Sequence, residues 1–441
     1  MVFEMKPRPL GSGFFCAQCF RPNRFLCAVN RQALFLYLVL AVTLSSCLEQ
    51  GCTDPEALNF DPSAQRDNES CRYGDKYVAE KETVIANYAD MAFAMYSDAL
   101  NTAIVLDTAI NAFLQNPTDD GFSMCRLAWQ SAKYQYAQCA PLRFYEGPVD
   151  GSPNYHRQMG AWPINPAIID YTPSGDGGLV ADLENFPVIN EKALEENNSG
   201  PNLLMGLHVI EFLLWGLDVD DPEDITVGYR TFEDYDLVDS SDVIIQRRRT
   251  YLKILSAKLV ADLTVVRNQW DPTAVANFRE EFVGQEVDKA MKQIMTGLGT
   301  LSRAEMAERA IKNVRLMGIE ENEISAYSDN TIFDLIAMNS GMEAITNGSY
   351  TAVDGTITSG LSLVALAALY DEELSNQITA QLELNKDAID AIPAPFDYQM
   401  SQELVFGDGP IAEAEVQLEA FEDLCFELAR EMDFGLNTDL P

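Results

Sequence analysis

A helical repeat of apolar residues constrains the fold of this chain more than any other feature. From Lys76 to Pro117, apolar residues recur at three- and four-residue spacing, and no proline interrupts the run before its end. A helix of this length can cross a helical bundle. The same period returns in later stretches, at residues 120–139, 201–216 and 240–269, in pieces over 272–317, and again after residue 323.

No stretch between residues 76 and 441 alternates apolar and polar residues in the manner of a half-buried strand. We therefore predict an all-α fold of two helical bundles. The first bundle is expected over residues 76–270 and the second over 319–436, with connecting helices at 271–318. Residues 140–200 are rich in Pro, Gly and aromatic residues, and a loop this long in a compact protein is usually functional.

The charge of the chain narrows the classes of partner. It has 30 Lys and Arg residues against 68 Asp and Glu residues, a net charge of -38. Such a chain repels phosphate backbones, so we expect no nucleic-acid partner. The acidity suits export and multivalent cations, although most of it is expected to be solvated surface.

The N-terminus has the order of a bacterial lipoprotein signal. After Arg31, the apolar run ALFLYLVLAVTL leads into LSSC, which ends at Cys47. The run is too short for a membrane span, which needs about 20 residues. We predict cleavage before Cys47 and lipid attachment to its thiol, and the alternative is an uncleaved anchor. By the enterobacterial sorting rule, Leu48 in place of Asp indicates the outer membrane. Residues 1–28 are unusual ahead of such a signal, which suggests that translation begins near Val29.

Two cysteines follow the anchor and bracket a loop rich in Pro, Asp and Asn. Outside the cytoplasm this pattern predicts a disulfide between Cys52 and Cys71, which would staple an acidic spacer over residues 48–75. The segment resembles short GCTDP modules of exported Bacteroidetes proteins. Its acidic side chains could instead hold calcium, although their spacing is not that of an EF-hand loop.

The positions of the other cysteines of the exported chain limit which of them can pair. Cys125 and Cys139 share one predicted helix, where 14 residues separate them by about 21 Å, beyond the reach of a disulfide. Cys425 leaves an odd count, so at least one buried thiol is expected.

A buried helix with two titratable groups is the candidate site. GLHVIEFLLWG, residues 206–216, is apolar except for His208 and Glu211, and the chain has only 2 histidines. Three residues apart on a helix, they share one face and can reach one ion or each other. A buried carboxylate needs a partner. Either an Arg and His208 satisfy Glu211 as a structural pair, or both groups are direct metal ligands with carboxylates from elsewhere.

This stretch resembles the GxHxxE motif of the imelysin family, bacterial envelope proteins linked to iron regulation and once assigned as metallopeptidases. Similarity extends from about Lys76 to Phe434. It implies two helical bundles with the motif facing a cleft between them. Five further blocks agree in order: LRFYEGPVD (142–150), AWPINPAIIDY (161–171), RRRTYLKILSAKLVADL (247–263), GLGTLSRAEMAERA (297–310) and EISAYSDNTIFDL (323–335).

The resemblance also implies which residues form the site. Gly206, His208 and Glu211 match the motif in full. The family commonly has Arg before the aromatic residue of the last block, where this chain has Ala326. The matched blocks add candidate supporting residues of the cleft, for which capping and loop bracing are the alternative roles: Arg143, Glu146, Asp150, Asp170, Ser328 and Asp329.

These observations favour a lipid-anchored, non-catalytic envelope protein that binds iron or another divalent cation, zinc included, through His208 and Glu211. It would serve iron uptake together with partner proteins. A His-rich zinc site is excluded because His156 is the other of the two histidines, and no GxSxG elbow for a serine hydrolase is present. The alternatives are a metallopeptidase in which Glu211 is catalytic, and a cleft that binds a peptide or small anion without metal.

Overall fold

The described residues divide into two compact units, with the boundary after Gly74. The predicted signal and its lipidated Cys47 lie outside the described residues. The computed structural model describes residues 49–55, 57–71, 74, 76–173, 175, 177–218, 227–237, 242–317 and 322–438.

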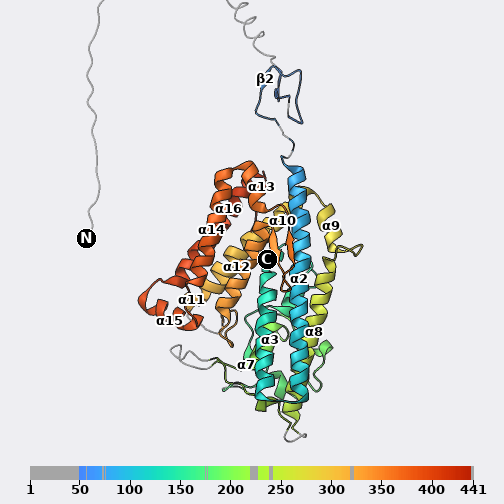
Figure 1. Cartoon of the computed structure of the whole chain (residues 1–441), viewed down its shortest axis with the longest axis vertical. Coiled ribbons are helices and arrows are strands. Elements are labelled where there is room, and N and C mark those ends of the chain that lie inside the picture. Colours follow the sequence, from blue (N-terminus) through green and yellow to red (C-terminus); the bar gives the residue numbers. More distant parts are fainter. Residues whose placement is uncertain are drawn as a thin grey trace, which may run out of the picture. The chain divides into compact units, whose positions relative to one another are not determined.

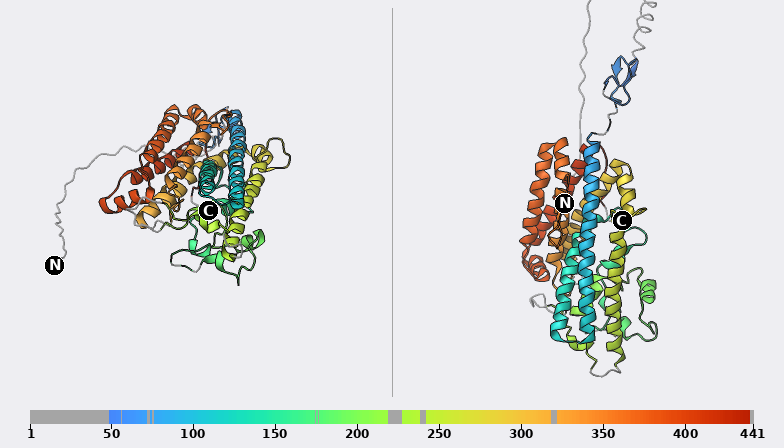
Figure 2. Two further views of the ribbon diagram at one scale, coloured as in Figure 1. Left: turned by 60° about the horizontal axis from the view of Figure 1, so that its bottom comes forward. Right: turned by 45° about the vertical axis from the view of Figure 1, so that its right-hand side comes forward.

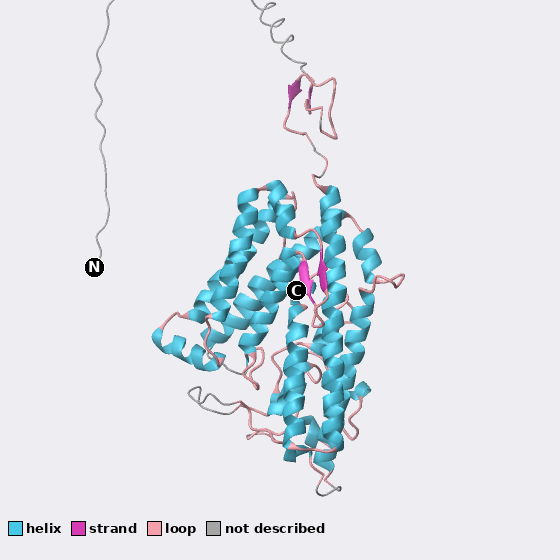
Figure 3. Cartoon of the chain, in the orientation of Figure 1, coloured by secondary structure: helices cyan, strands magenta, loops and turns pink. Residues whose placement is uncertain are grey.

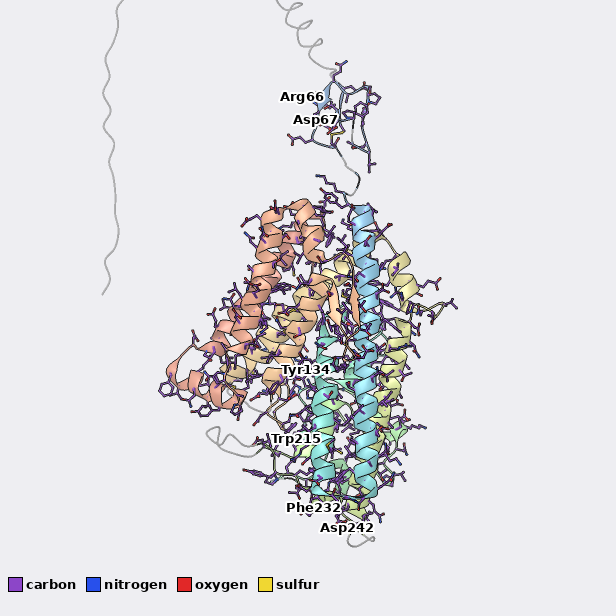
Figure 4. The ribbon with its side chains drawn as sticks, viewed as in Figure 1. Arg66, Asp67, Tyr134, Trp215, Phe232 and Asp242 are labelled. Atoms are coloured by element: carbon purple, nitrogen blue, oxygen red, sulfur yellow. A yellow bond between two sulfur atoms is a disulfide. The ribbon has the colours of Figure 1, made fainter. Side chains whose placement is uncertain are left out.

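The first unit is stapled by the predicted disulfide. Cys52 and Cys71 are bonded with an S–S distance of 2.08 Å, which confirms their pairing. Beside it, β1 (Gln50–Gly51) pairs in parallel with β2 (Arg66–Asp67), whose two residues are labelled in Figure 4. Its acidic side chains brace turns: Asp67 Oδ1, for example, accepts a hydrogen bond from the backbone N–H of Glu69 at 3.0 Å.

The second unit is built from two groups of helices, which confirms the predicted all-α class (Figure 1). In the first group, α2 packs against α3 and α8, and α7 packs against α3 and α8. In the second, α16 packs against α10, α14 and η4, and α12 joins the groups by packing on α3. The first group comprises α2 (Val78–Gln115), α3 (Asp119–Gln138), α7 (Leu207–Trp215) and α8 (Val243–Gln269). The second comprises α10 (Val287–Thr300), the π-helix η4 (Leu301–Lys312), α12 (Thr331–Asn347), α14 (Glu372–Asp390) and α16 (Pro410–Glu431).

Shorter helices complete the unit and cover the ends and sides of the long ones (Figure 2). One apolar core runs through both groups, and the predicted boundaries at residues 270 and 318 stay predictions. The shorter helices are η1 (Ala140–Leu142), α4 (Tyr155–Met159), η2 (Pro166–Ile168), α5 (Gly178–Ala181), α6 (Glu191–Asn197), η3 (Phe232–Tyr235), α9 (Phe278–Gly284), α11 (Asn313–Met317), α13 (Leu363–Tyr370) and α15 (Phe396–Phe406).

Side-chain caps set where the long helices begin. Thr118, directly after Pro117, accepts a hydrogen bond from the N–H of Gly121 at 3.1 Å and so starts α3. The Asp242 carboxylate accepts hydrogen bonds from the N–H groups of Ile244 and Ile245, so α8 begins at Val243, three residues later than the apolar period suggests. Among the described residues, none of the helices has both the length and the apolar character that crossing a membrane requires.

The structure differs from the sequence prediction in two places. A hairpin of β3 (Ser349–Thr351) and β4 (Ile357–Ser359) lies beside α2, although no strand was expected (Figure 3). Strands of three residues are too short for alternation to be visible in a sequence. The described part of the predicted loop at 140–200 contains five short helices, η1, α4, η2, α5 and α6, joined by turns and irregular segments.

The three cysteines of the helical unit, Cys125, Cys139 and Cys425, are free and buried, which confirms the expectation of at least one buried thiol. Cys125 lies within α3, and Cys139 is the residue that ends this helix.

Gly206, which starts α7, has a backbone that a side chain would strain. Its φ of 102° is open to glycine, and an added Cβ would lie 2.7 Å from the carbonyl oxygen of Met159. We expect Gly206→Ala to lower the free energy of unfolding by about 3 kcal/mol, because conformational strain and steric overlap add. Gly200, with a φ of 58° and open space around its Cβ position, is the matched control, and Gly200→Ala should cost about 1 kcal/mol. Urea unfolding measures both, and equal losses would contradict the steric argument.

Candidate functional site

Helix α7 is buried along its whole length, and its ends are satisfied by hydrogen bonds from neighbouring elements. At its start, the Trp129 indole on α3 donates to the carbonyl of Leu207 at 2.8 Å. At its end, Arg126 donates to the carbonyl of Leu214 at 3.0 and 3.1 Å, and the N–H of Arg230 donates to the carbonyl of Trp215 at 2.7 Å. Trp215, labelled in Figure 4, packs edge-on against Trp129 of α3. The helix therefore holds its side chains rigidly.

His208 and Glu211 contact each other within this helix, as the three-residue spacing predicts. His208 Nδ1 lies 3.1 Å from Glu211 Oε2, and the two residues are 2% and 0% exposed. The other ring nitrogen, His208 Nε2, is buried and has no hydrogen-bond partner in the part of the chain that the structure describes. When Glu211 is ionised, Nδ1–H donates to it and Nε2 presents a lone pair.

The second carboxylate oxygen of Glu211 is held from the other group of helices. Glu211 Oε1 accepts hydrogen bonds from the N–H of Tyr327 at 3.1 Å, the N–H of Ser328 at 3.1 Å and the hydroxyl of Ser328 at 2.8 Å. These donors come from the turn before α12. The pair thus lies between the two helical groups, where the resemblance places it.

A buried ion pair lies next to this helix. Lys133 Nζ on α3 is 2.8 Å from Asp334 Oδ1 on α12, and both side chains are almost fully buried. Asp334 also accepts from the Ser325 hydroxyl at 2.5 Å and from the Asn330 amide at 3.3 Å. Since the Lys133 charge is already balanced, this pair supplies no free ligand.

A second ionic cluster surrounds the other histidine. Arg143 Nη1 lies 2.6 Å from His156 Nε2, and Arg143 Nη2 donates to Glu305 Oε1 at 3.3 Å. The π-helix residue Arg309 donates to Glu305 Oε2 at 3.1 Å, while the Tyr136 hydroxyl lies 2.9 Å from His156 Nδ1. Two guanidinium groups therefore share one buried carboxylate.

A small cavity opens among these side chains. Its volume of about 20 Å³ is enough for about one water molecule. The buried hydroxyl of Tyr96 on its wall has no partner among the described residues. Its polar walls come from Tyr96, Lys133, Tyr136, Arg143, His156 and Glu305.

The electrostatics of the site keep both imidazoles neutral. Burial lowers the pKa of His208 well below its usual range, and the charges of Lys133 and Arg309 lower it further. Burial and the charge of Arg143 lower the pKa of His156 in the same way. Burial raises the pKa of Glu211 to about 8, against the hydrogen bond from Ser328.

Two of the predicted supporting residues, Ser328 and Arg143, reach these clusters, while Asp150, Asp170 and Glu146 lie elsewhere. Ser328 bonds Glu211, and Arg143 lines the cavity. Asp150 braces its own loop by accepting from the N–H groups of Phe144 and Gly147, and Asp170 forms buried ion pairs with Arg230 and Arg248. Glu146 is exposed, and Asp329 follows Ser328 with a φ of 54°.

Sequence reasoning missed Lys133, Asp334, Glu305 and Arg309. The last three lie inside sequence blocks that carry the family resemblance, so those blocks could have indicated them. Lys133 sits at an ordinary position of an amphipathic helix.

Comparison with a family model decides the affiliation. The model described as Imelysin matches residues 92–416. The chain belongs to the imelysin family. No curated protein matches this imelysin.

Two solved structures share its fold. One, from Parabacteroides distasonis, is described as an iron-regulated protein A precursor. It has a TM-score of 0.61 and 17% sequence identity, and the match covers 81% of this chain and 96% of that one. The other, an imelysin-like protein from Psychrobacter arcticum, has a TM-score of 0.55 and 15% identity, and the match covers 82% of this chain and 98% of that one.

The raised pKa of Glu211 makes a prediction for stability against pH. From its ordinary value of 4.5 up to about 8, the folded state binds more protons at Glu211 than the unfolded chain. The contribution of this residue to stability is therefore lost as pH rises through that window. From about pH 7 to 8.5 the wild type should lose about 1 kcal/mol relative to Glu211→Gln, which cannot titrate.

Urea unfolding at several pH values measures this difference. Glu305→Gln is the matched control, because Glu305 is equally buried but the charges of Arg143 and Arg309 hold its pKa below the usual range. The difference between wild type and Glu305→Gln should therefore stay constant over the same window. A constant difference for Glu211→Gln as well would contradict the raised pKa.

Proposed function

We propose that this imelysin serves iron uptake at the cell envelope and that His208 contacts the metal directly. The observation that carries the proposal is the buried His208, whose Nδ1 faces Glu211 while its Nε2 has no partner among the described residues. Family membership and the fold shared with a protein described as iron-regulated support the same role. Attachment to the outer membrane through a lipidated Cys47 belongs to the proposal and rests on the N-terminal sequence.

The donor chemistry at His208 fits iron or a related divalent cation. A neutral imidazole nitrogen is a good ligand for iron and zinc. Histidines that bind metals usually donate their other ring N–H to a carboxylate, which fixes the ring and its tautomer. Once it is ionised, which burial delays to a pKa of about 8 and which a bound cation would favour, Glu211 stands in that position, and three donors already hold its Oε1. We therefore assign Glu211 to orienting His208, rather than to direct contact with the metal.

The remaining ligands must come largely with the ion. Asp334 is paired with Lys133, and Glu305 with Arg143 and Arg309. Among the described residues, no group of three or more His, Cys, Asp or Glu side chains is placed to hold a metal. The site thus suits a cation that keeps water or an anionic ligand of its own.

A peptidase role is less well supported by this geometry. Metallopeptidases need a general base beside the metal-bound water. Glu211 is the nearest candidate, and its two oxygens already face His208 and the Tyr327–Ser328 turn. We therefore favour a non-catalytic protein.

Isothermal titration of the chelator-treated protein with iron tests the proposal. The wild type should bind one equivalent, and His208→Ala should abolish this binding. Glu211→Gln should weaken binding about 10- to 100-fold with unchanged stoichiometry, as expected for a residue that orients a ligand. His156→Gln is the matched control and should bind like the wild type. Undiminished uptake by His208→Ala would contradict the site.

One observation favours a second candidate, a small anion bound without metal. Lys133, Arg143 and Arg309 converge near the cavity against the two carboxylates Asp334 and Glu305. In that case chelator-treated protein binds chloride, an anion small enough for a cavity of this size. Arg309→Met then weakens binding about tenfold through loss of a charged donor, and His208→Ala leaves it unchanged. Titration calorimetry that detects no anion binding would exclude this candidate.

A further inference from the structure

A second polar pocket lies on the side of α8, built from residues that the His208 site does not use. Its volume is about 580 Å³. Helix α4 supplies Gln158, α6 supplies Glu195, and α8 supplies Lys258 and Asp262. Figure 2 shows the short helices of the green segment lying against α8.

Lys258 gathers three carboxylates at this pocket. Its ammonium group lies 2.7 Å from Asp262, 2.9 Å from Glu195 and 3.6 Å from Glu191. The neighbouring Arg157 donates its guanidinium hydrogens to loop carbonyls, those of residues 198, 200 and 202. The pocket lining itself carries two carboxylates and two cations, and Glu191, beside the lining, adds the one negative charge in excess.

Two acceptors in this pocket lack donors. Asp262 is 2% exposed, and Lys258 occupies its Oδ1. Its Oδ2 and the Oε1 of Gln158 are both buried without a hydrogen-bond partner within the described ranges. Leaving a buried carboxylate oxygen unpaired costs free energy, which a donor placed in the pocket would recover.

We propose that this pocket binds a small organic ammonium ion, whose N–H groups donate to Asp262 Oδ2 and Gln158 Oε1. The net negative charge favours a cation and opposes an anion. Met205, Ala261 and Val265 on the wall offer apolar contact for the carbon chain of an amine. A bare metal ion fits poorly, because Lys258 already holds the carboxylates. The proposal does not depend on the iron site.

Titration calorimetry with n-butylammonium in phosphate buffer tests the site. Tris is unsuitable because it carries a primary amine itself. We expect saturable binding with a Kd of about 1 mM or lower. Tetramethylammonium carries the same charge without N–H donors, so it should bind at least about tenfold more weakly.

Asp262→Asn, which removes the charge, should weaken n-butylammonium binding at least about tenfold. Gln158→Leu should weaken it to a smaller degree, and it keeps the test valid if Asp262→Asn does not fold. Asp390→Asn, at a partly exposed Asp of α14 that pairs with Lys386, is the matched control and should change nothing. The outcomes that would overturn the proposal are no saturable binding, equal binding of tetramethylammonium, or undiminished binding by both pocket variants.

Discussion

The burial of the Glu211 carboxylate is the constraint on which the rest of the site depends. A buried carboxylate without partners would cost several kcal/mol, so the fold must bring donors to it. One partner, His208, comes from the same helix, and three donors come from the Tyr327–Ser328 turn before α12. The need to give the Glu211 carboxylate hydrogen-bond donors thus couples the two groups of helices. It also holds the imidazole of His208 in a single orientation.

The carboxylates around this pair are all matched by cations. Lys133 is paired with Asp334, and Glu305 is paired with both Arg143 and Arg309, which leaves one positive charge in excess. Although the whole chain carries a net charge of -38, its buried site is not an acidic cage. The group left over is a neutral ring nitrogen. Because no carboxylate around His208 is left unpaired, the site favours an ion that contacts this one imidazole and brings its other ligands with it. An ion held by several carboxylates of the protein is less favoured.

Much of the fold could be predicted because the apolar period of a helix is visible among residues that are close together in the sequence. The apolar periods of α2, α3 and α8 are visible among neighbouring residues, so the bounds of these helices came out within a few residues, while the caps Thr118 and Asp242 became visible in the structure. The hairpin β3–β4 could not be predicted, because strands of three residues are too short to show an alternation of apolar and polar residues. For the site, spacing showed that His208 and Glu211 share a face. The family blocks then pointed to Ser328 and Arg143, while Lys133 looked like any polar residue of an amphipathic helix.

The sequence by itself determined the helical class, the Cys52–Cys71 disulfide, a buried helix within 201–216 and the shared face of its His and Glu. These follow from local period, from burial and from the positions of two nearby cysteines, which all act over short distances along the chain. Only the tertiary structure decided which donors satisfy Glu211, which cations neutralise Asp334 and Glu305, and that His208 Nε2 is left without a partner among the described residues. Those outcomes depend on which side chains from distant segments meet, and long-range packing sets this.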